Sequence, residues 1–263
     1  MELCQKNNKR LIHISTVSVS GFGEKEEFSI DSKDLNSKTF TEHDLYIGQN
    51  IKGIYSITKY KAELAVLEAI DSGLDAQILR IGNITNRFSD GHFQKNINDN
   101  AFARRIKSFV EIGAFPKYLL EHAIEFTPVD LCADAIIKIL QHNSPCTTFH
   151  IYDPNLLPIK VLYDTLTKRG IEMMPVSNEM MSYIITGILN DDSKKSMISG
   201  IIQDIDNKKQ FAYISKIGLN ADFTVQYLNK LGFNWAFFDS SYINKCFDYF
   251  EKINFINKTE ENK

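Results

Sequence analysis

A tyrosine and a lysine four residues apart form the pair in this sequence whose spacing most directly suggests chemistry. Tyr55 and Lys59 lie in residues 53–73, where apolar side chains recur at helical spacing until a glycine ends the pattern. Four residues are about one helical turn, so the ammonium of Lys59 would lie beside the phenol of Tyr55 and favour its phenolate. The pair therefore indicates proton transfer to or from a reacting oxygen. The alternative is a core helix whose lysine extends its charged end into solvent.

The same helix must present this pair to the rest of the fold. On a helical wheel, one sector holds Tyr55, Lys59, Ala62, Val66, Ala69 and Ile70, and the opposite side holds Lys61, Glu68 and Asp71. We therefore expect Tyr55 and Lys59 on the buried face of the helix. A lysine there requires a partner or a function, because an unpaired ammonium is costly to bury.

A hydroxyl at the end of an apolar run is the third candidate group. Residues 11–16, Leu-Ile-His-Ile-Ser-Thr, are typical of a buried parallel strand whose carboxyl end opens into a site. Thr16 would then donate a hydrogen bond in that site; alternatively, its hydroxyl satisfies backbone groups at the strand end. The nearby Gly21 and Gly23 do not form a phosphate-binding loop. Glu24 and the glutamates after it would repel a pyrophosphate, and the third glycine is missing.

Two further apolar runs supply the elements that must position these groups. Residues 76–82 and 147–152 are strand-like, and a helix start at residues 127–130 separates them. The order strand, helix, strand, helix, strand predicts a parallel sheet with crossover helices. Arg80 is unusual inside such a strand, and a role in the site and a structural ion pair both remain open.

The remaining segments predict the domain organisation. Residues 24–50 are polar and turn-rich and are expected to form a loop over the site, and residues 89–125 to form a helical insert. Beyond residue 154 the periodicity is mainly helical, so the sequence predicts a sheet domain over residues 1–154 and a helical subdomain over 155–263. Methionines clustered at 173–181 indicate either an adaptable core or a hydrophobic substrate channel.

The composition narrows the class of protein. The chain has 263 residues, a net charge of -3 and 43% hydrophobic residues, which suits a globular protein without the basic surface that nucleic acids require. Its four cysteines form no Cys-x-x-Cys pair, and its six histidines lack the spacing of metal ligands. No apolar run reaches membrane-spanning length, and the start has no signal-peptide core. We expect a cytoplasmic protein with no metal, no membrane and no nucleic-acid partner.

Several motifs taken together resemble one superfamily. They are Ile14-Ser-Thr-Val-Ser-Val-Ser-Gly21, Gly48-Gln49 ahead of Tyr55-Ser-Ile-Thr-Lys59-Tyr-Lys-Ala-Glu63, Leu79-Arg-Ile-Gly-Asn-Ile84, and Phe126-Thr-Pro-Val-Asp130. On these motifs the chain resembles, over nearly its whole length, the extended short-chain dehydrogenase/reductases. Within that superfamily it looks like the thioester reductase domains of nonribosomal peptide synthetases and the related carboxylic acid reductases.

The resemblance implies a Rossmann-like α/β fold and an NADPH-dependent reduction. The substrate would be an acyl or peptidyl thioester on the phosphopantetheine arm of a carrier protein that follows upstream synthetase modules, and the product an aldehyde or an alcohol. Thr16, Tyr55 and Lys59 would be the catalytic residues. The residues that the resemblance implies in cofactor binding are Tyr55, Lys59, Arg80, Ile81, Gly82 and Asn83.

One departure from the family pattern lies at the start of the chain. Members begin with a strand, Gly-x-x-Gly-x-x-Gly and a helix, for which nothing upstream of Leu11 provides a counterpart. We therefore expect the carboxyl-terminal half of the domain, with about three strands, a free edge on the first of them and no independent NADPH binding. Two alternatives stay open. One is another extended reductase or epimerase acting on a free acyl-CoA, a sugar nucleotide or a ketone, and the other is a non-catalytic remnant of the fold.

Overall fold

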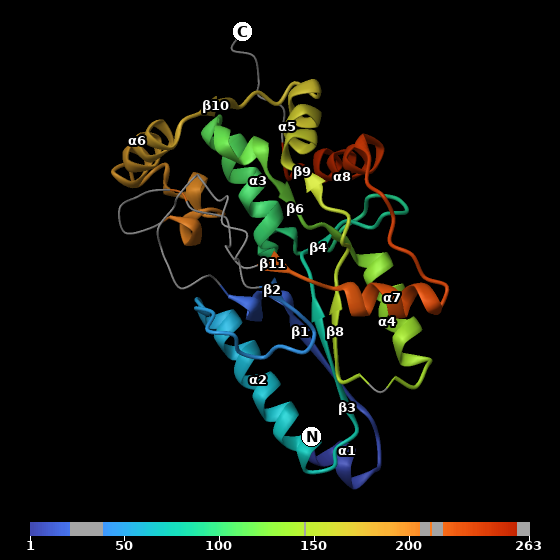
Figure 1. Cartoon of the computed structure of the whole chain (residues 1–263). Helices are drawn as coiled ribbons and strands as arrows, with labels where there is room; N and C mark the ends of the chain where they lie inside the picture. Colours follow the sequence, from blue (N-terminus) through green and yellow to red (C-terminus); the bar gives the residue numbers. More distant parts are fainter. Residues whose placement is uncertain (22–38, 145, 206–210, 212–217, 257–263) are drawn as a thin grey trace. The chain divides into compact units, whose positions relative to one another are not determined.

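Contacts within the chain divide it into two units. The computed structural model describes residues 1–21, 39–144, 146–205, 211 and 218–256 (Figure 1). Unit 1 consists of Met1–Ile84, Leu131–Pro154 and Ile214–Trp235, and unit 2 of Thr85–Asp130, Asn155–Tyr213 and Ala236–Lys263. The chain thus changes unit after residue 154, where the sequence places a domain boundary, while residues 214–235 belong with the sheet and not with the helical part.

Unit 1 is built on a parallel sheet in the order β1-β3-β8. Its strands are β1 (Leu11–Thr16), β3 (Ala76–Ile81) and β8 (Thr148–Ile151). Thr16 is paired with Ile81, and Ile81 with Ile151, so the carboxyl ends of the three strands lie level at one end of the sheet. The strands coincide with the three predicted runs to within a residue at each end. The parallel α/β architecture predicted from the sequence is confirmed.

Helices cover both faces of this sheet (Figure 1). Successive side chains of β3 point to opposite faces, as in any strand. On one face, α2 (Ile54–Asp71) packs Val66 against Ile78. On the other, Leu79 and Ile81 pack against α4 (Val129–Leu140) and α7 (Asp222–Lys230). The other buried members of this second core are Cys132, Ala135, Ile139, Phe149, Ile151, Leu228, Phe233 and Trp235.

Shorter elements complete unit 1. They are α1 (Glu2–Lys6), the 3₁₀ turn η1 (Val17–Ser20), β2 (Thr39–Phe40) and β11 (Gly218–Leu219), the last two paired in parallel. Of the expected loop at 24–50, residues 24–38 lie outside the described residues. The remainder, from 39 onward, leads from β2 into α2.

Unit 2 is mainly helical, as expected for the second part of the chain. Its helices are α3 (Ala101–Ile112), α5 (Ile159–Lys168), α6 (Asn178–Leu189) and α8 (Ser240–Lys252), with 3₁₀ turns η2 (Ile97–Asp99), η3 (Lys117–Glu121), η4 (Lys195–Ile198) and η5 (Ile202–Asp204). Strand β5 (Ala114–Pro116) pairs with β10 (Met174–Val176), and β6 (Ala123–Ile124) with β9 (Leu157–Pro158). Two other two-residue strands are β4 (Ile84–Thr85) and β7 (Thr127–Pro128).

Side-chain caps fix where three of these helices begin. Asn100, Ser177 and Asp239 accept hydrogen bonds from backbone amides in the first turns of α3, α6 and α8. Of the clustered methionines, Met173 and Met181 are buried, as in a core, whereas Met174 and Met180 are exposed; a hydrophobic substrate channel stays a prediction. Within the described part of the chain, every helix is too short or too polar to cross a membrane.

We expect residues 1–263 to self-associate through β1, whose outer edge has no strand partner among the described residues. Ile14 of β1 is 45% exposed. The substitution Ile14→Lys should lower the apparent mass measured by size-exclusion chromatography with light scattering, because a charge on an edge strand opposes pairing. Ile137→Lys is the matched control, since Ile137 is 50% exposed on α4 and away from the strands. Equal behaviour of the two variants would contradict a role for β1.

Candidate active site

Thr16 ends β1 at the edge where the neighbouring strands also end. Its side chain is buried, and its hydroxyl accepts a hydrogen bond from the Ser18 amide (3.2 Å) and donates one to the Ser18 hydroxyl (3.1 Å). The first of these bonds caps η1. The Thr16 hydroxyl therefore does satisfy a backbone group at the strand end, and its catalytic role stays a prediction. To bind a substrate oxygen, Thr16 would have to redirect only the bond that it donates to Ser18.

A glycine and a glutamine hold the loop after β1 against the segment before α2. Gly21 has φ +62°, and a Cβ on it would lie 2.6 Å from the Asn50 carbonyl oxygen, so a larger residue would clash there. Gln49 is buried, and its amide donates to the carbonyls of Val19 (3.2 Å) and Leu45 (2.9 Å). These contacts bring the end of β1 close to the start of α2 and give the Gly48-Gln49 motif a physical role.

Tyr55 lies in the first turn of α2, and the structure corrects its expected burial. Its side chain is 60% exposed and makes no hydrogen bond within the described part of the chain. The cause is the packing of α2, whose fully buried residues, Glu63 and Val66, begin two turns later. Lys59, one turn after Tyr55, donates from Nζ to the Ile14 carbonyl of β1 (2.8 Å). Since an ammonium has three donors, two remain available for other groups.

Arg80 has a buried acidic partner, Glu63, on α2. Arg80 Nε lies 3.1 Å from each carboxylate oxygen of Glu63, and Nη2 lies 2.8 Å from Oε2. The two residues are 1% and 0% exposed, and the Ser15 hydroxyl donates to the same carboxylate. The structure thus contains the ion pair that the sequence left open for Arg80, and the role in cofactor binding that the resemblance implies stays a prediction.

A histidine with a defined tautomer completes the surroundings of Arg80. Arg80 Nη1 lies 3.2 Å from His150 Nε2, and His150 Nδ1 lies 2.7 Å from the Asn220 carbonyl oxygen. Because a carbonyl only accepts, Nδ1 carries the proton and Nε2 accepts from Arg80. Burial, and secondarily the charge of Arg80, lower the pKa of His150 to about 4. The Phe40 ring stacks on His150 and covers the guanidinium, with 4.8 Å between Arg80 Cζ and the ring centre.

A second buried carboxylate joins the same region. Glu42 accepts hydrogen bonds from the amide (2.9 Å) and the hydroxyl (2.7 Å) of Thr224 in the first turn of α7. A negative charge at a helix start is favourable because the unpaired amides there carry partial positive charge. The Thr224 hydroxyl also accepts from the His150 amide (2.9 Å). We refer to Ser15, Glu42, Glu63, Arg80, His150 and Thr224 as the buried polar layer.

The exit of β3 carries the remaining predicted cofactor residues. Ile81 is buried, Gly82 is half-buried and Asn83 is exposed. The Gly82 amide donates to the Ile151 carbonyl of β8 (3.1 Å), which continues the strand pairing by one residue. The structure therefore places Thr16 and residues 81–83 along one edge of the sheet, with Arg80 one residue inside it.

Sequence reasoning misses most of the buried polar layer. A signal for Glu63 does exist, because it repeats the four-residue spacing from Tyr55 to Lys59, and a buried Arg80 requires an acidic partner. His150 and Glu42 give no such signal. Each is bonded to residues far away in the sequence, such as Thr224.

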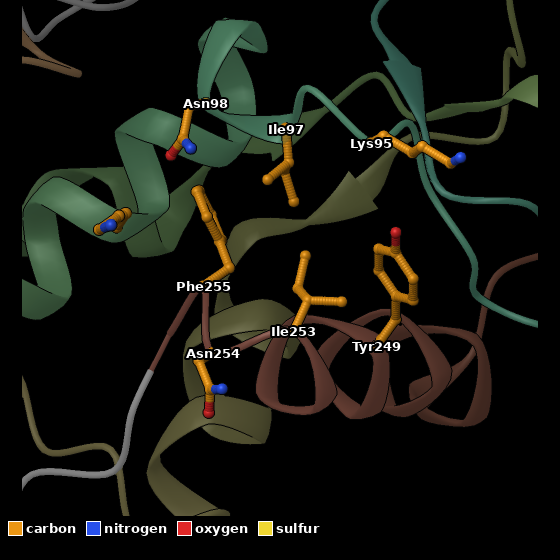
Figure 2. Close-up of a pocket in the computed structure, with 8 residues that line it drawn as sticks. Lys95, Ile97, Asn98, Tyr249, Ile253, Asn254 and Phe255 are labelled. Atoms are coloured by element: carbon orange, nitrogen blue, oxygen red, sulfur yellow. The ribbon is translucent and has the colours of Figure 1, made fainter.

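Unit 2 contains a pocket of about 330 Å³ (Figure 2). Its lining residues are Lys95, Ile97, Asn98, Lys107, Tyr249, Ile253, Asn254 and Phe255. Figure 2 shows Ile97, Ile253 and Phe255 extending toward one another, and the Lys107 ammonium lies 5.0 Å from the centre of the Phe255 ring. The lining thus combines apolar side chains with the polar groups of Lys95, Asn98 and Asn254. No site residue predicted from the sequence lines this pocket.

The chain matches one protein family and is similar to a curated reductase. Residues 1–136, just over half of the chain, match the NAD_binding_4 family, described as Male sterility protein. The glycine betaine reductase ATRR of Emericella nidulans is 29% identical over 182 residues, which make up 67% of this chain and 13% of that protein. The chain therefore spans a small part of this relative.

Solved structures share the fold over almost the entire chain. A thiolation-reductase di-domain from an archaeal non-ribosomal peptide synthetase matches with a TM-score of 0.77 and 27% identity, over 97% of this chain and 51% of that one. The reductase domain of the aureusimine biosynthetic cluster matches with a TM-score of 0.73 and 27% identity, over 96% of this chain and 63% of that one. The chain thus spans about half of the first of these structures and about two thirds of the second.

The buried polar layer should make stability depend on pH through His150. In the unfolded chain this imidazole has the ordinary pKa of 6.5, whereas in the folded chain burial lowers its pKa to about 4. Stability is therefore fully present above pH 6.5 and falls as the pH is lowered toward 4, because the unfolded state binds the proton first. One pKa unit corresponds to about 1.4 kcal/mol, so we expect a loss of about 3 kcal/mol in the free energy of unfolding.

Urea denaturation at pH values above 6.5 and near 4 measures this loss. In His150→Asn the free energy of unfolding should change less over the same interval, since that titrating group is gone. His142→Asn is the control, because His142 is exposed. A His150→Asn variant with the full wild-type pH dependence would show that other groups cause it.

Proposed function

The chain belongs to the NAD_binding_4 family, described as Male sterility protein, and from this premise we propose that it is a reductase domain that releases a carrier-bound acyl or peptidyl chain with NADPH. The product is an aldehyde, or an alcohol after a second reduction. The proposed partners are a phosphopantetheinylated carrier protein and upstream synthetase modules in the cytoplasm. Support comes from the similar solved structures, which are reductase domains of a non-ribosomal peptide synthetase and of a biosynthetic cluster. Unit 2, with the pocket of Figure 2, is proposed to receive the acyl chain.

The arrangement of Tyr55 and Lys59 beside the end of β1 is the observation that carries the proposal. Lys59 Nζ donates to the carbonyl of Ile14 (2.8 Å), which precedes Thr16 by two residues on β1, and Tyr55 precedes Lys59 by one turn of α2. Reduction of a carbonyl needs a proton donor, a cation that favours its deprotonation and a hydrogen-bond donor to the carbonyl oxygen. Tyr55, Lys59 and Thr16 are residues of the right types for these three tasks.

Residues along the same edge fit the nicotinamide end of the cofactor. Lys59 retains two donors that suit the ribose hydroxyls, and the exposed Asn83 suits the carboxamide. The half-buried Gly82 has no side chain to prevent close approach, and the buried Ile81 adds an apolar contact. Bound NADPH supplies the hydride.

The chain's own residues would control the oxygen and the proton. Reduction of the thioester carbon builds negative charge on the carbonyl oxygen, which the hydroxyls of Thr16 and Tyr55 stabilise by donating hydrogen bonds. Tyr55 passes its proton to that oxygen, and Lys59 stabilises the phenolate that remains. The carbon–sulfur bond then breaks. The proton that the former carbonyl oxygen of the substrate received moves to the sulfur of the leaving thiol, and the aldehyde is released.

A substrate comparison tests the proposal on the full-length natural protein. Each reaction contains NADPH and either an acyl thioester on a carrier protein, the matching free acyl-CoA or a ketone, and the aldehyde is identified by mass spectrometry. We expect preferential reduction of the carrier-bound thioester. Preference for a free substrate would favour another extended reductase or epimerase. Failure to bind NADPH in calorimetry would favour a non-catalytic remnant of the fold.

Tyr55→Phe should lower turnover by about 10² or more, because it removes only the proton donor. The melting temperature and the affinity for NADPH should stay close to wild type, since the Tyr55 side chain is 60% exposed and unbonded within the described residues. Steady-state kinetics and calorimetry measure both quantities. Tyr46→Phe is the control, because Tyr46 is a 65% exposed tyrosine of the same unit. Unchanged turnover of Tyr55→Phe would remove Tyr55 from the mechanism.

Lys59→Ala should lower turnover and also weaken NADPH binding, because this lysine serves both the phenolate and the ribose in the proposed site. Lys61→Ala is the control, since Lys61 is exposed two residues further along α2. NADPH titration of both variants separates the two roles. An effect of Lys59→Ala on the melting temperature alone would show that its bond to the Ile14 carbonyl is structural.

A further inference from the structure

We propose that Glu63 and Arg80 are positioning residues for the catalytic pair. Their buried ion pair fixes where α2 lies along the sheet, and through the helix it sets the positions of Tyr55 and Lys59. Neither residue would touch the substrate or the cofactor. The inference rests on the proposed function, because only that function makes Tyr55 and Lys59 catalytic. The geometry of the ion pair is independent of it.

The ion pair joins α2 to two strands at once. The Glu63 carboxylate accepts from Arg80 Nε and Nη2 on the central strand β3 at 2.8 to 3.1 Å, and from the Ser15 hydroxyl on β1. A helix rises about 1.5 Å per residue, so a slide of α2 by a single residue would break every one of these bonds. Lys59 and Tyr55 precede Glu63 by four and eight residues and therefore lie on the same side of the helix.

Arg80 cannot follow a displaced helix, because its other contacts hold it. Nη1 donates to His150 Nε2 (3.2 Å) and lies 3.4 Å from the Thr41 carbonyl oxygen, and the Phe40 ring covers the guanidinium. The planar guanidinium also requires a defined direction of approach from the carboxylate. By contrast, the packing of Val66 on Ile78 sets no such direction. The ion pair is therefore a directional restraint on α2, buried between the helix and the sheet, in addition to the bond from Lys59 to the Ile14 carbonyl.

Replacing both members of the pair tests this role without leaving an unpaired charge. Breaking a buried pair destabilises strongly, whereas an apolar pair of similar size is often tolerated. In the full-length protein, the double variant Glu63→Met with Arg80→Met should keep a melting temperature near wild type. Its kcat should fall by roughly 10- to 100-fold, because small displacements of catalytic groups have effects of this size. Its KM should change much less.

An exposed ion pair in the same unit serves as a control. Arg10 and Asp75 form a two-bond ion pair of 2.9 and 3.0 Å just before β1 and β3, at the opposite end of the strands from Thr16. The double variant Arg10→Met with Asp75→Met should leave kcat unchanged. Glu63→Asp is a second probe, since it keeps the charge but shortens the reach; it should also lower kcat, and it carries the test if the double variant does not fold.

A folded double variant, or a folded Glu63→Asp variant, with wild-type kcat would overturn the proposal. Amide hydrogen exchange gives a readout that does not need activity. The first two turns of α2 should exchange faster in the Glu63 and Arg80 double variant than in the control. If the wild-type protein reduces no thioester but this difference appears, the proposed function fails and the positioning role stands. Equal exchange in both variants would overturn the positioning role itself.

Discussion

Glu63 and Arg80 meet where no solvent competes for either charge, and the elements around the candidate site are each bonded to one of them. Glu63 belongs to α2 and accepts from Ser15 of β1, while Arg80 belongs to β3 and contacts His150 of β8. In the low dielectric of the interior such a pair contributes little net stability compared with an apolar pair, but it tolerates few geometries. It therefore selects one arrangement of the helix on the sheet and excludes the neighbouring registers that apolar packing alone would permit.

The segments that cover the two faces of the sheet consequently need different side chains. Under α4 and α7 the face is apolar, and any side chain of suitable size would fill it. Under α2 it is mixed: Val66 packs on Ile78, but the donors and acceptors around Arg80 each need a specific partner. This requirement explains why the short segment around β2 is enclosed: Phe40 covers Arg80 and His150, and Glu42 satisfies the start of α7. A substitution of Glu42 would also affect His150, because Thr224 is hydrogen-bonded to both residues.

The sequence predicts the three strands of the main sheet and the helix α2 because their signals are local. The run from Leu11 to Thr16 and the periodicity of α2 require no knowledge of distant residues, and both match the structure closely. The exposure of Tyr55 could not be read in the same way, because periodicity gives the face of a helix but not the residue at which packing begins. The partner of Arg80 is another long-range property, since Glu63 and Arg80 are 17 residues apart and sit on different elements. Strands of two residues, such as β2, are too short to show any period. The roles of Thr16, Tyr55 and Lys59 follow from residue type and resemblance, and remain predictions.

The division of the chain into two interleaved units has a consequence for its biosynthesis. The backbone passes from one unit to the other five times, so neither unit is a continuous stretch of sequence. A ribosome releases β1, β3 and β8 long before α7, which supplies Thr224 to the polar layer and Leu228, followed by Trp235, to the apolar core. Until residue 235 has emerged, the nascent sheet lacks part of the cover on its apolar face, and such surfaces bind chaperones or other chains. Unit 1 can therefore complete its fold only after residue 235 has been made.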